Sequence, residues 1–285
     1  MSTPLLQEAN SKPQPHAIVR FIRNFTDMYM AGAYCGKVTG PFTVRQVINL
    51  HKLLVAPVYL AMLWYFAGDL SLKEIWGPAA SALLICHGTY GFLWVYKDIY
   101  YGDPSWQRPT GFLGAASIFI YPLGLYYSPM LCLITHYCDF ARFGQGNEPW
   151  VLGIGLWFYI IGMFYHYCSD LQKHVQLSLE RPRKLITTTL FAHTRNPNYF
   201  GEVMIYVGFA VLSMNWLPLG LFSIAWLNIF VPNMLAKEAS MSRHAAWKDW
   251  VARSGMFFPY LPTLISEFCC NALSKTAIPP SASPP

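Results

Sequence analysis

Residues 190–202, LFAHTRNPNYFGE, hold the densest group of side chains in this sequence that could do chemistry. If Pro197 occupies the first turn of a helix, where its missing N–H is not needed, then Asn198 and Glu202 lie one above the other at i and i+4. Tyr206 continues the same face. An amide, a carboxylate and a phenol would thus be aligned, and such groups can hold a polar ligand or move protons.

These polar residues stand at the start of a long uncharged run, 203–235. Polar groups at membrane depth are costly unless they have partners, so they are functional candidates by default. The alternative interpretation is structural, with Glu202 pairing with Arg195 at a capped helix start. The residues alone leave both interpretations open.

A second polar and aromatic face recurs in HGTYGFLWVYKD, residues 87–98. His87 and Tyr90 lie one turn apart on the predicted helix, followed by aromatic and charged residues at the same spacing. Gly88 and Gly91 permit the close approach of a neighbouring helix or of a ligand. An interfacial belt would explain the aromatic residues, but it would not explain His87, which lies deeper.

The composition indicates a membrane protein. Only 12% of the 285 residues are charged, whereas 54% are apolar, which is far from the composition of a soluble domain. A helix needs about 20 apolar residues to cross the hydrocarbon core of a bilayer. The uncharged runs 75–96, 111–138 and 150–169 are therefore each expected to form one spanning helix.

Two further regions complete the predicted spans. The weaker run 53–68, counted as the first span, extends backward to about Val47 if His51 and Lys52 lie at an interface with snorkelling side chains. The run 203–235 is too long for one helix and contains Pro218, which removes a helical hydrogen bond. A hairpin of two short spans is expected there. The predicted fold is all-α and polytopic, with about six transmembrane helices and seven as the alternative.

Cationic residues predict the orientation, because short cytoplasmic loops collect Lys and Arg. With six spans, all of the 20 Lys and Arg residues except Lys73 and Arg142 fall on one side. This split predicts that both termini and the loop 170–199 are cytoplasmic. No basic tract is interleaved with a soluble domain, so a nucleic-acid partner is not expected.

Three segments resemble those of a known family. NPNYFGE (196–202), with Arg195 before it, resembles the signature of the steroid 5α-reductase-like membrane reductases and the related sterol reductases. HYCSDLQK (166–173) and MSRHAAWKDWVARSGMFFPYLP (241–262) are similar to two other parts of that family. Isoprenylcysteine and phospholipid methyltransferases have a related version of the first motif. The resemblance covers roughly residues 150–262.

In that family the C-terminal half holds NADPH, so the resemblance implies a cofactor site. The residues that it implies are Asp170, Asn198, Tyr199, Glu202, Asp249, Trp250 and Arg253. The phosphates of NADPH need Lys or Arg on the water side, and the loop 170–199 supplies Lys173, Arg181, Arg183, Lys184 and Arg195. Asn196 departs from the pattern, since many relatives have histidine there.

The chain divides into four predicted parts. Residues 1–44 form a disordered or amphipathic arm, and 45–149 form transmembrane helices on the substrate side. Residues 150–262 form the cofactor-binding membrane domain, and 263–285 form a disordered tail. The resemblance also implies the endoplasmic reticulum membrane as the location.

The leading hypothesis is an NADPH-dependent reductase of the carbon–carbon double bond in an α,β-unsaturated carbonyl lipid, such as a steroid. Hydride would attack the β-carbon while a buried acid polarises the carbonyl group. Tyr90 is expected to be that acid, because a phenol stays protonated at neutral pH. Glu202, His87 and the remaining tyrosines are the alternatives.

Two other functions remain open. One is an S-adenosylmethionine-dependent methyltransferase, although Lys237-Glu238 stands where its relatives show a Glu-Glu pair. The other is a sterol-binding protein without catalysis. A metal site is not expected, because His166, Asp170 and His174 are the nearest approach to a ligand cluster. Steroid, sterol, enoyl thioester and polyprenoid carbonyl all remain candidate substrates.

Overall fold

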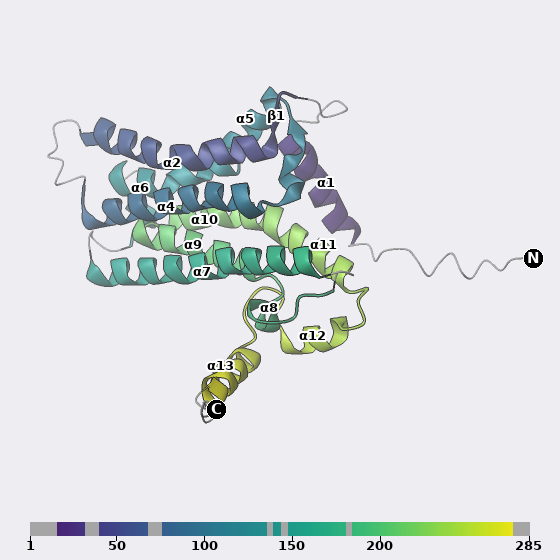
Figure 1. The fold of residues 1–285 in the computed structure, drawn as a ribbon. Coiled ribbons are helices and arrows are strands. Elements are labelled where there is room, and N and C mark those ends of the chain that lie inside the picture. The colour runs from purple at the N-terminus through teal and green to yellow at the C-terminus, as the bar shows by residue number, and fades with distance from the viewer. Residues whose placement is uncertain are drawn as a thin grey trace, which may run out of the picture.

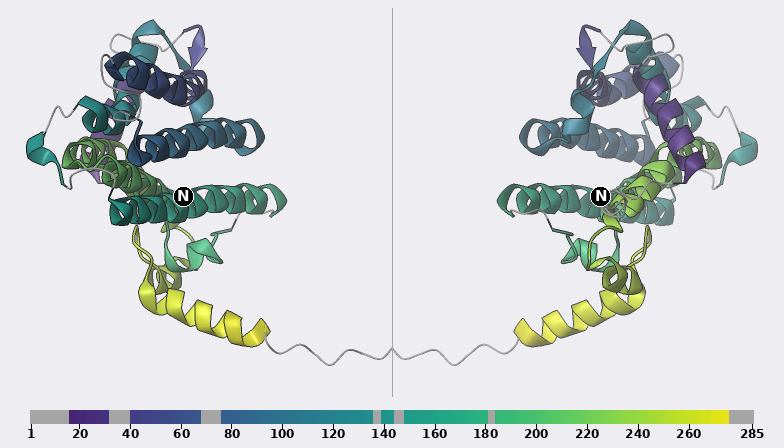
Figure 2. Two further views of the ribbon diagram at one scale, coloured as in Figure 1. Left: turned by 90° about the vertical axis from the view of Figure 1, so that its left-hand side faces the viewer. Right: turned by 90° about the vertical axis from the view of Figure 1, so that its right-hand side faces the viewer.

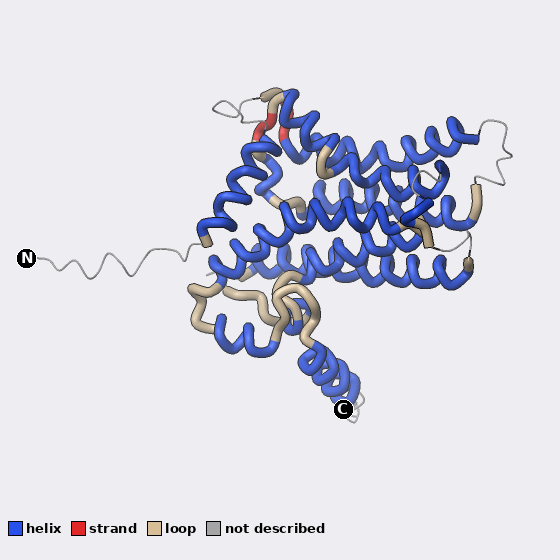
Figure 3. Tube along the Cα trace, turned by 180° about the vertical axis from the view of Figure 1, so that it is seen from behind, coloured by secondary structure: helices blue, strands red, loops and turns tan. Residues whose placement is uncertain are grey.

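The computed structural model describes residues 16–31, 40–67, 76–135, 139–143, 148–180 and 184–275. These residues are almost entirely helical (Figures 1 and 3), with one pair of two-residue strands. The helices are α1 (Ala17–Ala31), α2 (Val44–Ala67), α4 (Pro78–Tyr101), α5 (Phe112–Ile120), α6 (Ser128–Thr135), α7 (Pro149–Leu179), α8 (Leu190–His193), α9 (Pro197–Leu212), α10 (Trp216–Ala225), α11 (Val231–Met241), α12 (Trp247–Arg253) and α13 (Leu261–Lys275). Shorter elements are β1 (Phe42–Thr43), β2 (Pro109–Thr110), the 3-10 helices η3 (Pro104–Gln107), η4 (Leu123–Tyr127) and η5 (Asp139–Ala141), and the π-helix η6 (Trp226–Phe230). The predicted all-α class is confirmed.

Within the described residues, five helical segments are long and apolar enough to cross a membrane: Val44–Phe66, Pro78–Tyr101, Phe112–Thr135, Pro149–Leu179 and Trp216–Met241. The protein is therefore a polytopic membrane protein. The remaining predicted span is α9, which has only 16 residues and packs along α7 (Figure 1).

The predicted break of 203–235 into two helices is confirmed, although only the second helical segment, from Trp216, is long enough to span a membrane. Helix α9 ends at Leu212, and Met214 has a φ of 50° in the left-handed region. The Asn215 side chain then accepts a 2.8 Å hydrogen bond from the backbone N–H of Leu217, which caps the start of α10. Pro218 lies in the first turn of α10, where it needs no hydrogen-bond donor.

The predicted span over 111–138 is confirmed as Phe112–Thr135, but it is not one continuous helix. The helix ends at Ile120, and η4 separates α5 from α6. The physical reason is Pro122, which cannot continue the hydrogen-bond ladder of α5. The interruption places Tyr126 of η4 in the core.

The connections lie at two ends of the bundle. At one end, β1 pairs with β2, which ties the start of α2 to the segment after α4. At the other end, Arg142 forms a bridge with Asn215, which ties the segment before α7 to the α9–α10 turn. These pairings agree with the predicted alternation of the helices; which end faces the cytoplasm stays a prediction.

Helices α7 and α9 approach so closely that their contact requires glycine. A Cβ atom added to Gly201 would lie 2.4 Å from the backbone nitrogen of His166, and one added to Gly162 would lie 2.6 Å from the carbonyl oxygen of Gly201. Small residues allow such approaches between helices in membrane proteins. As a result, Glu202 on α9 lies beside the polar stretch of α7 that includes Asp170.

Helices α2 and α4 also meet at a glycine. A Cβ atom on Gly91 would lie 2.2 Å from the carbonyl oxygen of Lys52, so the predicted close neighbour of Gly91 is α2. His51 and Lys52 are both buried in this contact. The prediction that these two side chains snorkel at an interface is therefore wrong.

Helices α8, α12 and α13 form a small unit on one side of the bundle, and α13 projects away from it (Figures 1 and 2). Residues 261–275 are helical, so the prediction of a disordered tail is wrong for 263–275, while 276–285 lie outside the described residues. In the N-terminal arm, α1 is an amphipathic helix.

Candidate functional site

A pocket of about 200 Å³ lies where α4, α7 and α9 meet at the end of the bundle that holds η3. We call it the first pocket. Five residues of the predicted cofactor site line it: Asp170, Lys173, Asn198, Tyr199 and Glu202. The structure therefore brings together residues from two segments that were singled out separately in the sequence.

Local helix geometry explains this convergence. Asn196 precedes α9 and Pro197 is its first residue, as predicted, so Asn198 and Glu202 share one face of the helix. On α7, His166 and Asp170 are spaced at i and i+4. The glycine contact between α7 and α9 then brings the two faces together.

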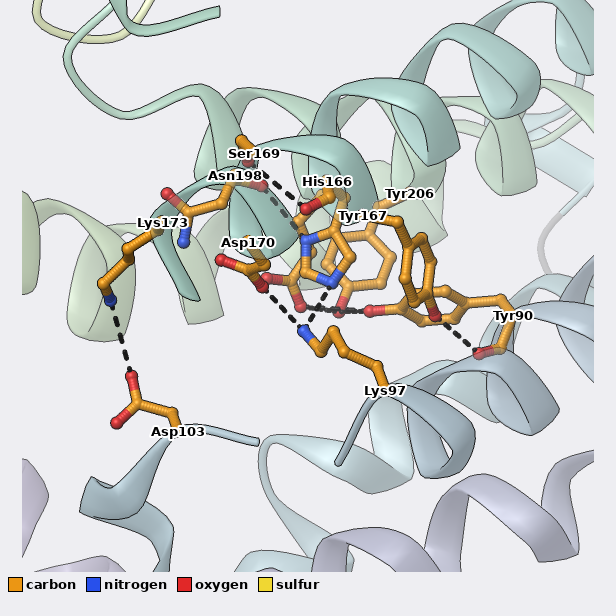
Figure 4. A network of polar contacts seen from close by, with 11 residues as sticks. Tyr90, Lys97, Asp103, His166, Tyr167, Ser169, Asp170, Lys173, Asn198 and Tyr206 are labelled. Atoms are coloured by element: carbon orange, nitrogen blue, oxygen red, sulfur yellow. Dashed lines mark hydrogen bonds and ion pairs between the residues drawn. The ribbon is translucent and has the colours of Figure 1, made fainter. Parts of the chain in front are cut away.

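Lys97 on α4 is the centre of a polar network in the first pocket (Figure 4). Its ammonium group donates a 2.8 Å hydrogen bond to Asp170 Oδ2 and lies 3.0 Å from His166 Nε2. The other ring nitrogen of His166, Nδ1, lies 3.3 Å from the backbone oxygen of Asn198. Lys97 thus joins all three helices, and its charge is neutralised by Asp170.

Near η3, Lys173 faces Asp103, with 3.9 Å between Nζ and Oδ2. Partial burial raises the pKa of Asp103, but the backbone N–H of Ser105 and the charge of Lys173 outweigh it, so the net pKa is below its usual range. Among the described lining residues, the carboxylates outnumber the Lys side chains: Asp98, Asp103, Asp170 and Glu202 against Lys97 and Lys173. The first pocket is thus not a cationic one.

Glu202 is the acceptor in a cluster of tyrosine hydroxyls. Tyr206 donates a 2.7 Å hydrogen bond to Glu202 Oε1, and Tyr90 donates a 3.2 Å hydrogen bond to the same oxygen. The hydroxyl of Tyr126 on η4 hydrogen-bonds that of Tyr206. The cluster is buried, so Glu202 is held by several donors at once.

A second pocket, of about 100 Å³, adjoins the first and shares Trp94, Trp106, Tyr199 and Glu202 with it. Its other walls are mainly apolar and come from α2, α5, η4, η6 and α11; they are Ile48, Lys52, Ile118, Pro122, Leu123, Tyr126, Ile229, Phe230 and Asn233. A smaller third pocket of about 40 Å³ continues along η6 and shares Pro122, Tyr126, Ile229 and Phe230 with the second. A polar space and an apolar space therefore meet at Glu202.

Four predicted cofactor residues do not line these pockets: Arg195, Asp249, Trp250 and Arg253. Arg195 forms a two-pronged ion pair with Glu238, at 2.8 Å between Nη2 and Oε2, and it does not pair with Glu202. The Trp250 indole donates a 2.7 Å hydrogen bond to the backbone oxygen of Phe191. Asp249 and Arg253 are exposed on α12.

These contacts show a structural role for the segment 241–262, which resembles the family. Asn196, just before α9, donates a 2.9 Å hydrogen bond to the backbone oxygen of Met256, and Thr194 bridges to Gly255. The segment after α12 therefore anchors the start of α9. Through that anchor it fixes the position of Asn198.

His87, a predicted alternative acid, does not contact the Tyr90 hydroxyl. Its Nδ1 lies 2.8 Å from the Tyr59 hydroxyl, which donates to the backbone oxygen of Tyr126 at 2.7 Å, and its ring stacks on Phe209. Lys52 lines the second pocket, and the sequence did not predict it as a site residue. Its position next to His51 at the start of an apolar run was the only signal.

A family of unknown function matches this part of the chain. The model described as "Protein of unknown function (DUF1295)" matches residues 119–250, a range that includes Asp170 and Glu202. The chain is also 25% identical over 170 residues to the very-long-chain enoyl-CoA reductase of Dictyostelium discoideum. That match covers 55% of this chain and 51% of the other, so the chain spans about half the length of this curated relative. No solved structure matches the chain significantly.

Proposed function

We propose that this protein is a membrane reductase that uses NADPH to reduce the carbon–carbon double bond of an α,β-unsaturated carbonyl lipid. The observation that carries the proposal is the meeting of a polar pocket and an apolar pocket at Glu202. A hydride transfer needs a water-soluble donor and an apolar acceptor in contact. The similarity to a protein named enoyl-CoA reductase supports the same reaction class.

The nicotinamide end of the cofactor suits the first pocket. Asn198 and Asp170 offer an amide and a carboxylate to a carboxamide or a ribose hydroxyl. The excess of carboxylates suits a ring that becomes positive when it gives up hydride, and it does not suit phosphates. A volume of about 200 Å³ is below the roughly 300–1,000 Å³ of typical ligand pockets, so only one end of a dinucleotide would fit.

The phosphates would then lie outside the first pocket. Lys237 is close, with its ammonium group 4.7 Å from the centroid of the Tyr199 ring. Helix α7 continues to Leu179, so the predicted loop 170–199 is reduced to the connections around α8. Lys184 is exposed in the connection between α7 and α8, and Arg181 and Arg183 of that connection lie outside the described residues. These cations are the proposed partners of the pyrophosphate and the 2′-phosphate.

The carbonyl end of the lipid would occupy the second pocket, and the lipid would approach along the third. Their volumes of about 100 and 40 Å³ are, like that of the first pocket, too small for a whole ligand. The walls of both are mainly apolar, and both include residues of the π-helix η6. Single π-helical turns inside α-helices occur frequently at functional sites. A substrate carbonyl group in the second pocket would lie against the residues that both pockets share, next to Glu202.

The bound cofactor would supply a hydride to the β-carbon of the substrate. The protein's own groups hold the reactants and exclude water, which strengthens every polar contact in the site. The hydroxyls of Tyr126 and Tyr206 and the carboxyl group of Glu202 form a connected path along which a proton can reach the second pocket. That proton would complete the reduction at the α-carbon.

The test is binding and turnover with the purified full chain in detergent. We expect tighter binding of NADPH than of NADH, and NADPH oxidation that depends on an unsaturated carbonyl lipid. Two lipids are compared, a 3-oxo-Δ4 steroid and a trans-2-enoyl-CoA, and each has its saturated counterpart as control. Saturable binding of S-adenosylmethionine alone would replace the proposal with a methyltransferase. Cofactor binding without any turnover of either lipid would remove the proposed substrate class.

A further inference from the structure

We infer that Lys52 is a substrate-binding residue whose ammonium group holds the carbonyl oxygen of the lipid in the second pocket. The inference deepens the proposed function and rests on it for the identity of the ligand. Lys52 lines that pocket together with Glu202 and Tyr126. It lies before the matched range 119–250, in α2.

The ammonium group of Lys52 is buried and has no hydrogen-bond acceptor. The residue is only 2% exposed, and its Nζ has no partner among the described residues. An ammonium group carries three donors and no acceptor, and a buried donor without a partner is costly. An oxygen atom supplied by a ligand would remove that cost.

Aromatic rings surround the ammonium group on several sides. Its Nζ lies 3.9 Å from the ring centroid of Tyr126, 4.2 Å from that of Tyr90 and 4.8 Å from that of Trp94. Ring faces stabilise a cation without accepting its hydrogen bonds in the way an oxygen does. The rings therefore hold Lys52 in place while its N–H groups stay available.

Backbone packing fixes the direction of Lys52. The contact between Gly91 and the carbonyl oxygen of Lys52 brings α2 against α4 at this residue. The Lys52 side chain then lies over Tyr90 and Trp94 of α4. A side chain in place of the Gly91 hydrogen would push α2 away and move the ammonium group out of this position.

In the proposed reaction, Lys52 acts where negative charge appears. When hydride forms a bond to the β-carbon, the π electrons of the double bond shift toward the carbonyl group, and the oxygen of the resulting enolate becomes negative. A hydrogen bond from Lys52 to that oxygen is stronger in this state than with the neutral carbonyl. A proton then adds to the α-carbon, the carbonyl group is restored, and the substrate has gained one hydride and one proton.

The experiment reads the carbonyl group directly. The probes are a 3-oxo-Δ4 steroid and a trans-2-enoyl thioester, each with ¹³C at the carbonyl carbon, bound to the full chain in the presence of NADP⁺, so that no reduction occurs. We expect the infrared carbonyl band of a bound probe to shift to lower frequency in the wild type. Lys52→Met should abolish that shift, and Lys52→Arg should keep most of it.

Turnover provides the second readout. Lys52→Met should lower turnover by roughly 10²–10³-fold, as the loss of one donor to a developing oxyanion does, without a loss of NADPH binding. Lys248→Met, the same change at an exposed lysine on α12, should behave as the wild type. If Lys52→Met fails to fold, Lys52→Gln provides the same comparison with an uncharged donor, and its band shift should be smaller.

An equal carbonyl shift in the wild type and in Lys52→Met, or in Lys52→Gln where Lys52→Met does not fold, would overturn the inference, as would binding of neither probe. Lys52 would then be a structural cation among aromatic rings. A carbonyl shift that depends on Lys52, without any reduction of the lipid by the wild type, would support the binding site and contradict only the proposed reductase function.

Discussion

The Tyr90 hydroxyl donates a 3.2 Å hydrogen bond to Glu202 Oε1, although 112 residues separate the two in the chain. Tyr206 donates to the same oxygen at 2.7 Å. The hydroxyl of Tyr90 is therefore directed at Glu202, and Tyr90 does not line the second pocket, whereas Lys52 does. This arrangement separates two assignments of the group that polarises the carbonyl.

Tyr90→Phe keeps the ring and removes only the hydroxyl group. Since Glu202 retains its shorter hydrogen bond from Tyr206, we expect turnover to fall by less than about tenfold, the effect of one neutral hydrogen bond. Steady-state turnover of Tyr90→Phe and of Lys52→Met, each compared with the wild type, measures the difference between the two assignments. A loss of roughly 10²-fold or more in Tyr90→Phe would instead assign the acid to Tyr90, as the sequence predicts.

Asn198→Ala tests which of the predicted residues hold the cofactor. Asn198 lines the first pocket, so its loss should weaken NADPH binding by about three- to tenfold, consistent with one lost hydrogen bond. Arg253→Ala is the matched control, because Arg253 is exposed on α12 and lines none of the described pockets. Titration of cofactor fluorescence gives both affinities. A weaker affinity in Arg253→Ala alone would favour the resemblance over the geometry.

Gly201→Ala tests the close contact between α7 and α9. The added methyl group would meet the backbone of His166, so we expect a loss of about 1–3 kcal/mol in the free energy of unfolding, the usual cost of overpacking. In α7, Gly153 has open space around its Cα. Gly153→Ala should therefore leave stability unchanged or raise it by up to about 1 kcal/mol. Unfolding in mixed micelles compares the two variants, and equal stabilities would refute the contact.

We expect His193 to make the stability of the unit formed by α8, α12 and α13 depend on pH. Burial lowers the pKa of His193 below its usual range, although the Glu267 carboxylate, 3.6 Å away, acts in the opposite direction. The Tyr165 hydroxyl contacts the other ring nitrogen at 3.1 Å. Below the usual histidine pKa of about 6.5, the unfolded chain binds a proton that the folded chain does not. The contribution of His193 to the free energy of unfolding is therefore complete above that pH and is lost as the pH falls.

We expect the unfolding temperature to decrease when the pH is lowered from about 7.5 to about 5.5. His193→Gln cannot take up this proton, so its pH dependence in the same range should be weaker. The comparison of the two slopes isolates His193 from the remaining groups. Parallel slopes would show that His193 does not contribute.

The sequence was sufficient for the features that depend on neighbouring residues. Hydropathy is a property of contiguous residues, so the apolar runs predict the spanning helices, and the break before Pro218 follows from the chemistry of proline. Helical periodicity likewise places Asn198, Glu202 and Tyr206 on one face of α9. These inferences needed no partner helix.

The tertiary structure decided which side chains face one another. Arg195 pairs with Glu238 of α11 and not with the nearby Glu202, and its guanidinium group also donates to the backbone oxygen of Ser254 at the end of α12. Lys52 turns inward because Gly91 admits the backbone of α2 at this residue, a contact between positions 39 apart in the sequence. Hydropathy treats such a lysine as an interfacial charge, since no local pattern records which face of a helix its neighbours cover.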